Sequence, residues 1–411
     1  MNHGFLSVIS REEFQSRLAR FTPLDSRTVP LAQAAGRVLA TTLTAPEDLP
    51  PHARSSMDGY AVAARDTFGA SEANPAYLEL AFKIAIETAP DQPLAPGSCA
   101  AIPTGGWLPA GADAVVMVEH TDPSGDLIEI RKSVAPGENV MLPGEDAKAG
   151  EPVVQAGQLL RTQEIGLLAG LGVAEADVVR RPRVGILSTG NELVECGETP
   201  GPGQMRDVNR PTLAALTAEA GGEVVDLGLA PDDEDRLAEA LKRGGEDCDL
   251  VLLSGGSSIG VRDLSVAALE SLGGEILAHG VALSPGKPTI LARLGNMPVL
   301  GLPGQVASAL VIAHVLVAPL VRHLSGQRDA FARPWRPVVQ AELARNLASK
   351  PGREDWVRVM LEERPGRMPL AKPVPGKSGL LFTLLQAHGL AVLPADSEGC
   401  YQGETVPVML L

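Results

Sequence analysis

Residues 250–263 are the clearest candidate for anion chemistry in this sequence. The apolar run from Leu250 to Leu253 leads directly into Ser254-Gly255-Gly256-Ser257-Ser258. Such a run is typical of a strand buried on both faces of a sheet, and adjacent glycines let backbone amides approach an oxyanion. Asp263 precedes an apolar run with helical spacing, so it is a candidate N-cap and a candidate ligand for a metal or a proton. A plain turn with a capping aspartate fits the same spacing.

Three other turns should open on the same edge of the sheet. They are Ser188-Thr189-Gly190-Asn191-Glu192, Ser284-Pro285-Gly286-Lys287-Pro288 and Gly301-Leu302-Pro303-Gly304. Loops after parallel strands lie on one side of a sheet, so Glu192 and Asp263 are expected near each other, and two carboxylates with phosphate oxygens suit Mg²⁺. Lys287 suits a contact with phosphate, and the free amides after Pro303 favour an anion. Each turn alone fits a structural role, but their shared position favours a binding site.

Polar turns also occur in the N-terminal region of the chain. Asp58 stands in an Asp-Gly turn, Thr104 in a glycine turn, and Asp146 in the acidic turn 143–146. A plain turn explains Asp58 equally well, and an acidic turn such as that of Asp146 is more often only solvated than functional.

The elements that position these turns follow from hydrophobic periodicity. Residues 183 to about 322 alternate strands with helices, as in a parallel sheet covered on both faces. The strands are expected at 184–187, 224–227, 250–253, 290–294 and 299–302, and the helices at 209–220 with Asn209 as its cap, 235–241 and 306–321. Upstream, a capping box at Ser10 predicts a short helix, and helices are expected at 31–39 and 162–171. Short β-prone runs are expected at 77–86, 99–102, 114–119 and 127–130.

The 411 residues therefore predict a multidomain α/β plus β protein. The N-terminal region, 1–180, contains two sub-domains, one from about 1–45 with 147–180 and one from about 46–146. Residues 181–326 form a doubly wound α/β domain, and 327–411 form a small β domain.

Composition excludes several classes of function. There are 50 acidic and 35 basic residues, a net charge of −15, without a Lys/Arg tract, so a nucleic-acid partner is not expected. The apolar run 306–321 is shorter than the roughly 20 residues that a bilayer requires, so we expect a core helix and no membrane partner. The four cysteines lack metal or disulfide spacing and the N-terminus lacks a signal peptide, which together predict a cytoplasmic protein.

In combination the motifs resemble one family. Its pattern is matched in order by Ser55-Ser56-Met57-Asp58-Gly59-Tyr60-Ala61, Thr104-Gly105, Gly144-Glu145-Asp146, the Ser188 and Ser254 turns, Pro285-Gly286-Lys287-Pro288, Gly301-Leu302-Pro303-Gly304 and Pro351-Gly352-Arg353. The set resembles the MoeA/gephyrin E-domain family of molybdopterin molybdenumtransferases. The resemblance implies a MoeA-like fold with a MogA-like α/β domain and a C-terminal barrel-like β domain.

The resemblance also implies an activity and its partners. The family inserts molybdate into adenylylated molybdopterin with Mg²⁺-dependent release of AMP. It implies a homodimer in which the lobe carrying Asp58 reaches the α/β domain of the other subunit. Molybdopterin adenylyltransferase and molybdenum-enzyme maturation proteins are further candidate partners.

The resemblance also implies site residues, because the site positions of the family match residues of this sequence one by one. The catalytic positions are Asp58, Glu192, Asp232 and Asp263, of which Glu192 and Asp263 are the candidate metal ligands. The substrate-binding positions are Thr104, Asp146, Ser188, Thr189, Gly190, Ser254, Gly255, Gly256, Ser257, Lys287, Pro303 and Arg353.

The sequence departs from the family pattern at four places. Ser284 and Gly280 stand where lysines are usual, Gln305-Val306 replaces Asn-Pro, and Asn191 replaces an aspartate. Fewer cations weaken the binding of an oxyanion unless Arg262 or Arg293 substitutes. The alternatives to the transferase are therefore a divergent paralogue that binds molybdopterin with altered or lost activity and a non-enzymatic scaffold.

Overall fold

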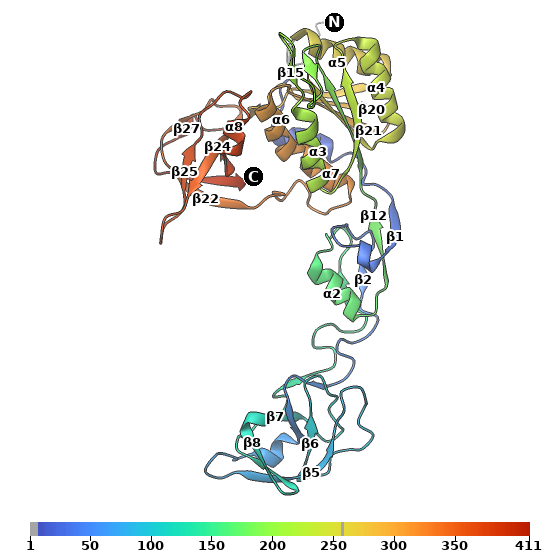
Figure 1. The fold of residues 1–411 in the computed structure, drawn as a ribbon, viewed down its shortest axis with the longest axis vertical. Helices are drawn as coiled ribbons and strands as arrows, with labels where there is room; N and C mark the ends of the chain where they lie inside the picture. The colour runs from blue at the N-terminus through green and yellow to red at the C-terminus, as the bar shows by residue number, and fades with distance from the viewer. Residues whose placement is uncertain (1–6, 256–258) are drawn as a thin grey trace.

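The structure is a computed structural model that describes residues 7–255 and 259–411, and of residues 259–263 it describes the backbone only. Figure 1 shows an elongated molecule. A β lobe lies at one end, a small region around α2 lies in the middle, and an α/β domain with the C-terminal β domain beside it lies at the other end.

A six-stranded sheet forms the centre of the α/β domain. Its spatial order is β16 (Glu223–Ala230), β13 (Arg183–Thr189), β17 (Leu250–Gly255), β21 (Met297–Leu302), β20 (Ile290–Leu294) and β18 (Glu275–His279). The first four strands are mutually parallel, whereas β20 and β18 are antiparallel to their neighbours. The carboxyl ends of β13, β17 and β21 therefore meet at one edge.

Helices cover both faces of this sheet. One face carries α1 (Arg11–Leu18), α3 (Asn209–Glu219), α6 (Val306–Ile312), the π-helical turn Ala313–Val317 and α7 (Ala318–Leu324). The other carries α4 (Glu234–Asp247) and α5 (Ile259–Ser271). Leu250 and Leu252 pack into the first layer and Val251 and Leu253 into the second, which explains the unbroken apolar run.

The apolar stretch Val306–Leu324 is the centre of the first layer. By length and composition alone its 19 residues could cross a membrane, but 83% of its most apolar window is buried inside the protein. The expected core helix is confirmed by this burial.

Two helix boundaries differ from the expectation in the α/β domain. Helix α5 begins at Ile259, so Asp263 lies one turn inside it and is not its N-cap. Gly260 costs a helix only about 1 kcal/mol, which the rest of the helix offsets. Helix α3 has Val208 at its cap position, and Asn209 is its first helical residue.

The middle region is built from two distant parts of the chain. Antiparallel ladders join β1 (Ser26–Pro30) to β12 (Glu175–Val179) and β2 (Leu43–Thr44) to β11 (Pro152–Val154), beside α2 (Thr162–Gly170). The prediction of a helix at 31–39 is wrong, because only the 3₁₀ turn Leu31–Gln33 forms. Gly36 then adopts a φ of 72°, which ends the turn, and Val38 and Leu39 form β-bridges.

The distal lobe is a mostly β domain. Its sheet has the order β7 (Ala114–Met117), β4 (Gly59–Val62), β6 (Ser98–Ile102), β5 (Ala76–Lys83), β9 (Leu127–Ile130) and β8 (Thr121–Ser124). A short ladder of β3 (Arg54–Ser55) with β10 (Val140–Met141) lies beside it, with 3₁₀ turns at Ala64–Thr67 and Val118–His120.

The C-terminal domain closes into a barrel. The strands β24 (Glu354–Glu362), β25 (Leu370–Pro373), β22 (Val338–Leu343), β28 (Thr405–Leu410) and β26 (Gly389–Leu393) form a ring because β24 also pairs with β26. β19 (Leu283–Ser284), from the α/β domain, adds to β24. The remaining short elements are β14 (Leu193–Val194), β15 (Met205–Arg206), β23 (Leu347–Ala348), β27 (Gly399–Cys400) and α8 (Phe382–Leu385).

Candidate active site

Two polar strand ends lie side by side at the carboxyl edge of the sheet. In the parallel ladder Ser188 is opposite Ser254, and Thr189 is opposite Gly255. A Cβ added at Gly255 would lie 2.1 Å from the carbonyl oxygen of Thr189, and its φ is 133°. This position therefore requires glycine, and the two backbones approach each other closely where a ligand would meet them.

Asp232 connects the end of β16 to this edge. Thr189 Oγ1 donates to Asp232 Oδ1 at 2.8 Å, and the Asp232 amide donates to Asn191 Oδ1 at 3.2 Å. These contacts fix the loop after β13 to the loop after β16. Ser188, by contrast, has its hydroxyl turned inward, since the residue is fully buried.

Glu192 is the exposed carboxylate of the same loop. It lies over Gly190, where an added Cβ would be 2.9 Å from a carboxylate oxygen. Its carboxylate makes no hydrogen bond or ion pair within the described part of the chain, so it is available to a cation. Gly256, Ser257 and the side chain of Asp263 lie outside the described residues. The pairing of Glu192 with Asp263 thus stays a prediction.

The N-cap role expected for Asn209 is wrong, because its side chain reaches across the sheet edge. Its Nδ2 donates to Ser254 Oγ and to the Gly304 carbonyl, both at 2.8 Å. The capping role belongs to Asp207, whose Oδ1 accepts from the amides of Asn209 and Arg210. Asn209 therefore ties the end of β17 to the turn after β21. An asparagine at a helix start is ordinarily a cap, so no local signal distinguishes this case.

The turn that carries Lys287 reaches the same edge from β20. Ser284 pairs in register with Asp355 of the barrel strand β24, and Arg353 lies 3.2 Å from the Asp355 carboxylate. A Cβ added at Gly286 would be 2.5 Å from Ile312 of α6, so this turn packs closely on that helix. Lys287 is exposed. The structure thus brings Lys287 and Arg353 to the boundary between the α/β domain and the barrel.

A loop of the barrel at residues 375–379 also reaches this boundary. The Ala307 amide of α6 donates to the Ser378 carbonyl at 3.0 Å. Because α6 follows Pro303 and Gly304 directly, this loop lies next to the turn that Asn209 holds. Nothing in the sequence of these residues shows which helix they contact.

Asp58 and Thr104 lie together, but in the distal lobe (Figure 1). The Thr104 amide and hydroxyl donate to Asp58 Oδ1 at 2.7 and 2.9 Å. These hydrogen bonds, the amide first, lower the pKa of the exposed Asp58 carboxyl below its usual value. Asp146 lies elsewhere, in the connection to the middle region, where its amide donates to Leu49. Within one chain the structure does not bring these residues to the sheet edge.

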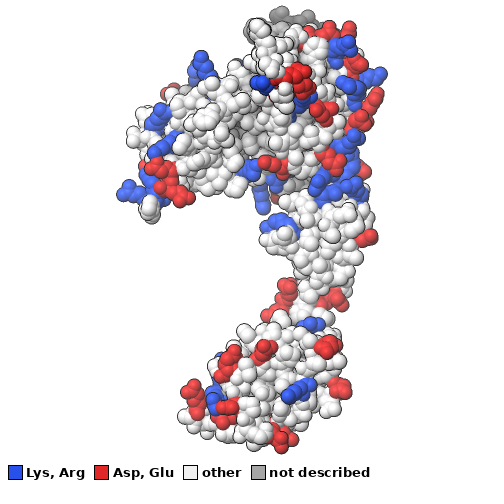
Figure 2. All heavy atoms as spheres, in the orientation of Figure 1, with Lys and Arg blue, Asp and Glu red and all other residues white. Residues whose placement is uncertain are grey.

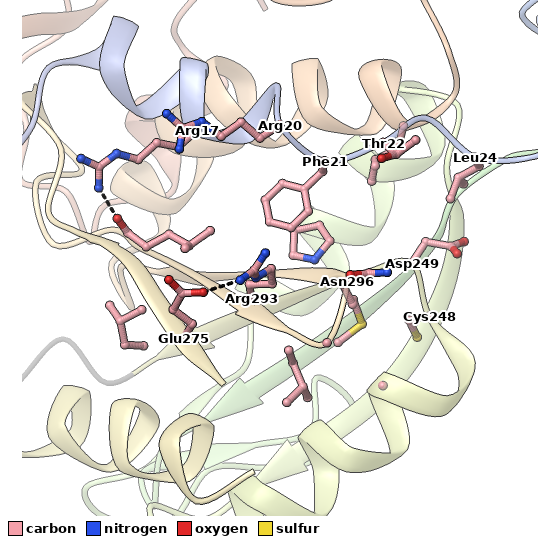
Figure 3. Close-up of a pocket in the computed structure, with 18 of the residues that line it drawn as sticks. Arg17, Arg20, Phe21, Thr22, Leu24, Cys248, Asp249, Glu275, Arg293 and Asn296 are labelled. Carbon is pink, nitrogen blue, oxygen red and sulfur yellow. Dashed lines mark hydrogen bonds and ion pairs between the residues drawn. The ribbon is translucent and has the colours of Figure 1, made fainter. Parts of the chain in front are cut away.

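Figure 2 shows acidic and basic side chains scattered over the visible face, with basic ones gathered where the α/β domain meets the middle region. A cavity of about 960 Å³ opens between α1 and the amino ends of the strands, where Arg293 pairs with Glu275 at 2.5 Å (Figure 3). Since that cavity lies at the edge opposite Thr189 and Gly255, it is separate from the candidate site.

Three family models together cover most of the chain. Residues 9–172 match the MoeA N-terminal region (domain I and II), 185–323 a probable molybdopterin binding domain, and 340–411 the MoeA C-terminal region (domain IV). The molybdopterin molybdenumtransferase 2 of Mycobacterium tuberculosis is 38% identical over 90% of this chain and 91% of its own length. The chain belongs to the MoeA family.

Other relatives support MoeA membership over nearly the full length. The molybdopterin molybdenumtransferase of Haemophilus influenzae is 33% identical and covers 98% of both chains. A crystal structure of the MoeA molybdopterin biosynthesis protein of Pyrococcus horikoshii OT3 aligns with a TM-score of 0.83 and 30% identity, over 98% of this chain and all of that one. The resemblance inferred from the motifs and the multidomain α/β plus β fold are both confirmed.

Proposed function

We propose that this MoeA-family protein is a molybdopterin molybdenumtransferase of molybdenum cofactor biosynthesis. It transfers molybdenum from molybdate to adenylylated molybdopterin with Mg²⁺-dependent release of AMP. The observation that carries this proposal is the carboxyl edge of the α/β sheet, where Thr189, Gly255 and the Pro303 turn converge in a domain that matches a molybdopterin-binding model. Ligands of open α/β sheets bind at this edge.

Each part of the edge has a separate role in the proposal. The close backbones at Thr189 and Gly255 form the floor on which the pterin phosphate lies, because no side chain of Gly255 intervenes. Asp232 orients the Thr189 hydroxyl, and Asn209 keeps the turn after Pro303 in place. Lys287 supplies a positive charge for phosphate or molybdate.

The residues at this edge suit Mg²⁺. Glu192 offers a solvated carboxylate without a protein partner among the described residues, and Asp263 is the second candidate ligand. Mg²⁺ is commonly held by one or two carboxylates together with substrate phosphate oxygens. When bound there, it would neutralise phosphate charge during cleavage of the adenylate.

The proposal includes a homodimer, because Asp58 and Thr104 lie in a lobe at the far end of the chain from the sheet edge. Apolar side chains are exposed in the same lobe, namely Met57 at 40%, Met141 at 37% and Leu142 at 52%. If this lobe docked on a partner subunit, the partner would cover these apolar side chains, and Asp58 would lie at the sheet edge of the partner. The four free cysteines suit a reducing cytoplasm.

Turnover by the purified protein is the decisive test of the activity. With molybdate, Mg²⁺ and adenylylated molybdopterin, we expect AMP release together with molybdenum bound to the pterin. Binding of the pterin without either product would instead support the divergent paralogue. A protein that binds no pterin would contradict both.

Subunit sharing is tested by mixing two inactive variants. Asp58→Asn and Glu192→Gln each remove one half of the shared site. Heterodimers formed from an equal mixture contain one intact site, so about a quarter of wild-type transfer should return. No recovery after confirmed subunit exchange would show that Asp58 and Glu192 act within one chain.

A further inference from the structure

Among the described residues, the α/β side of the proposed oxyanion site offers few cations. In the turn 283–288, which packs on α6, Lys287 is the single basic residue. Arg353 is already engaged by Asp355, at 3.2 Å. Molybdate and the pterin phosphates carry several negative charges, so a further fixed cation beside Lys287 and the proposed Mg²⁺ would strengthen their binding.

The barrel loop 375–379 is held firmly at this boundary. The Ala307 amide donates to the Ser378 carbonyl at 3.0 Å, and Arg358 Nη2 donates to the Gly376 carbonyl at 2.6 Å. Arg358 also donates through Nη1 to the Thr383 hydroxyl. Lys377 thus stands between two residues whose carbonyls are fixed by different domains.

The same two elements also hold the turn that carries Lys287. On β24, Ser284 pairs with Asp355, and Arg358 lies three residues further along, about 10 Å away at the usual strand rise. On α6, an added Cβ at Gly286 would be 3.9 Å from the carbonyl oxygen of Ser308, the neighbour of Ala307. Turn 283–288 and loop 375–379 are therefore adjacent.

Lys377 itself is available for a ligand. It is exposed, and it makes no hydrogen bond or ion pair with any residue that the structure describes. Lys372, five residues earlier in the same barrel, differs because it pairs with Glu362 across the ladder of β24 and β25. The two lysines lie in the same domain, but only Lys372 has a carboxylate partner among the described residues.

We propose that Lys377 supplies the second cation of the oxyanion site, from the barrel instead of from position 284. This inference rests on the proposed function. It explains how a chain with Ser284 retains enough positive charge for an anionic substrate. It also predicts that a lysine at 284 and the lysine at 377 are interchangeable.

The test combines single and double substitutions in the full-length dimer. Lys377→Ala should raise the molybdate concentration for half-maximal transfer by about 5- to 150-fold, as expected for one charge-assisted hydrogen bond, and should weaken its dependence on salt. Ser284→Lys should change little in the wild type but restore affinity in the Lys377→Ala background. Lys377→Arg should retain affinity, and Lys372→Ala is the matched control for loss of a barrel lysine.

Each outcome bears on the inference separately from the activity. If the wild type transfers molybdenum and Lys377→Ala matches it at low and high salt, the inference is wrong while the proposed function stands. The inference would equally be contradicted if Ser284→Lys tightened molybdate binding in the wild type but did not restore it in the Lys377→Ala background. Should the wild type transfer nothing, calorimetric titration of molybdate decides, since weaker binding by Lys377→Ala supports the inference and equal binding overturns it.

Discussion

At the carboxyl edge of the α/β sheet, the pairing of buried strands fixes the positions of the polar residues. In the distal lobe, a surface turn fixes the position of Asp58. Thr189 and Ser254 are each only 1% exposed, and their neighbours are set by the ladder between β13 and β17. Asp58 is exposed, and its described partner is Thr104 in the same lobe. The edge therefore depends on the integrity of a whole domain, while the lobe carries a small preformed unit that can act wherever the lobe is placed.

The strongest test of this difference is Gly255→Ala. The new Cβ would lie 2.1 Å from the Thr189 carbonyl oxygen, so one of the two strands must shift. We expect the free energy of unfolding of the α/β domain to fall by about 3 kcal/mol or more. Urea unfolding measures it. Gly273→Ala is the control, because Gly273 has a φ of 75° with open space around it and should cost only about 1 kcal/mol.

A loss of folding stability between pH 6.5 and 4 should also arise in the α/β domain, from His314. Burial lowers the pKa of His314 to about 4, with a smaller contribution from Arg336. Between pH 6.5 and 4 the unfolded chain binds a proton that the folded chain does not, so stability falls with falling pH by up to about 3 kcal/mol. His314→Phe keeps the stacking on Trp335 and should flatten this dependence in urea unfolding at pH 7, 5.5 and 4.5.

The control for this substitution lies in the lobe. His52→Phe changes an exposed ring that contacts Trp107, at 4.0 Å between centroids. If both variants keep the wild-type pH dependence, His314 does not titrate on unfolding, and the acid sensitivity of the α/β domain has another source.

Loss of the Asn209 bridge should have a smaller effect. Asn209→Ala removes one buried and one partly buried hydrogen bond and leaves Ser254 Oγ and the Gly304 carbonyl without that donor. We expect a loss of about 2 kcal/mol in unfolding free energy and weaker pterin binding. Asn346→Ala, at an exposed asparagine that accepts one amide hydrogen bond, is the matched control. Equal losses in the two variants would show that Asn209 has no special place at the edge.

Much of the sheet edge could be predicted from the sequence because its signals are local. The apolar run Leu250–Leu253 and the turns after it show a buried strand and its end, and parallel strands must end together. The contacts of Asn209 and Ser378 could not be predicted, since both residues bind partners from other elements. The predicted start of α5 at Asp263 is also wrong, because tertiary packing outweighs the cost of including Gly260 in the helix. The proposed reach of Asp58 into a second subunit concerns an assembly, which neither local pattern nor periodicity encodes.

The smallest expected effect concerns the preformed unit in the lobe. The Thr104 amide contributes most to lowering the Asp58 pKa and the Thr104 hydroxyl contributes next. Thr104→Val removes only the hydroxyl, so the Asp58 pKa should rise part of the way toward its ordinary value, and the carboxylate should take up its proton at a higher pH than in the wild type. Carboxyl carbon NMR would follow this titration directly, and the acid limb of the transfer rate should move in the same direction if the ionised Asp58 is needed in the partner's site. The conservative Thr104→Ser, which keeps the hydroxyl, should restore both. An NMR shift without any movement of the acid limb would mean that the charge of Asp58 is not required for transfer, and Asp58 would then act only in holding the lobe against the partner.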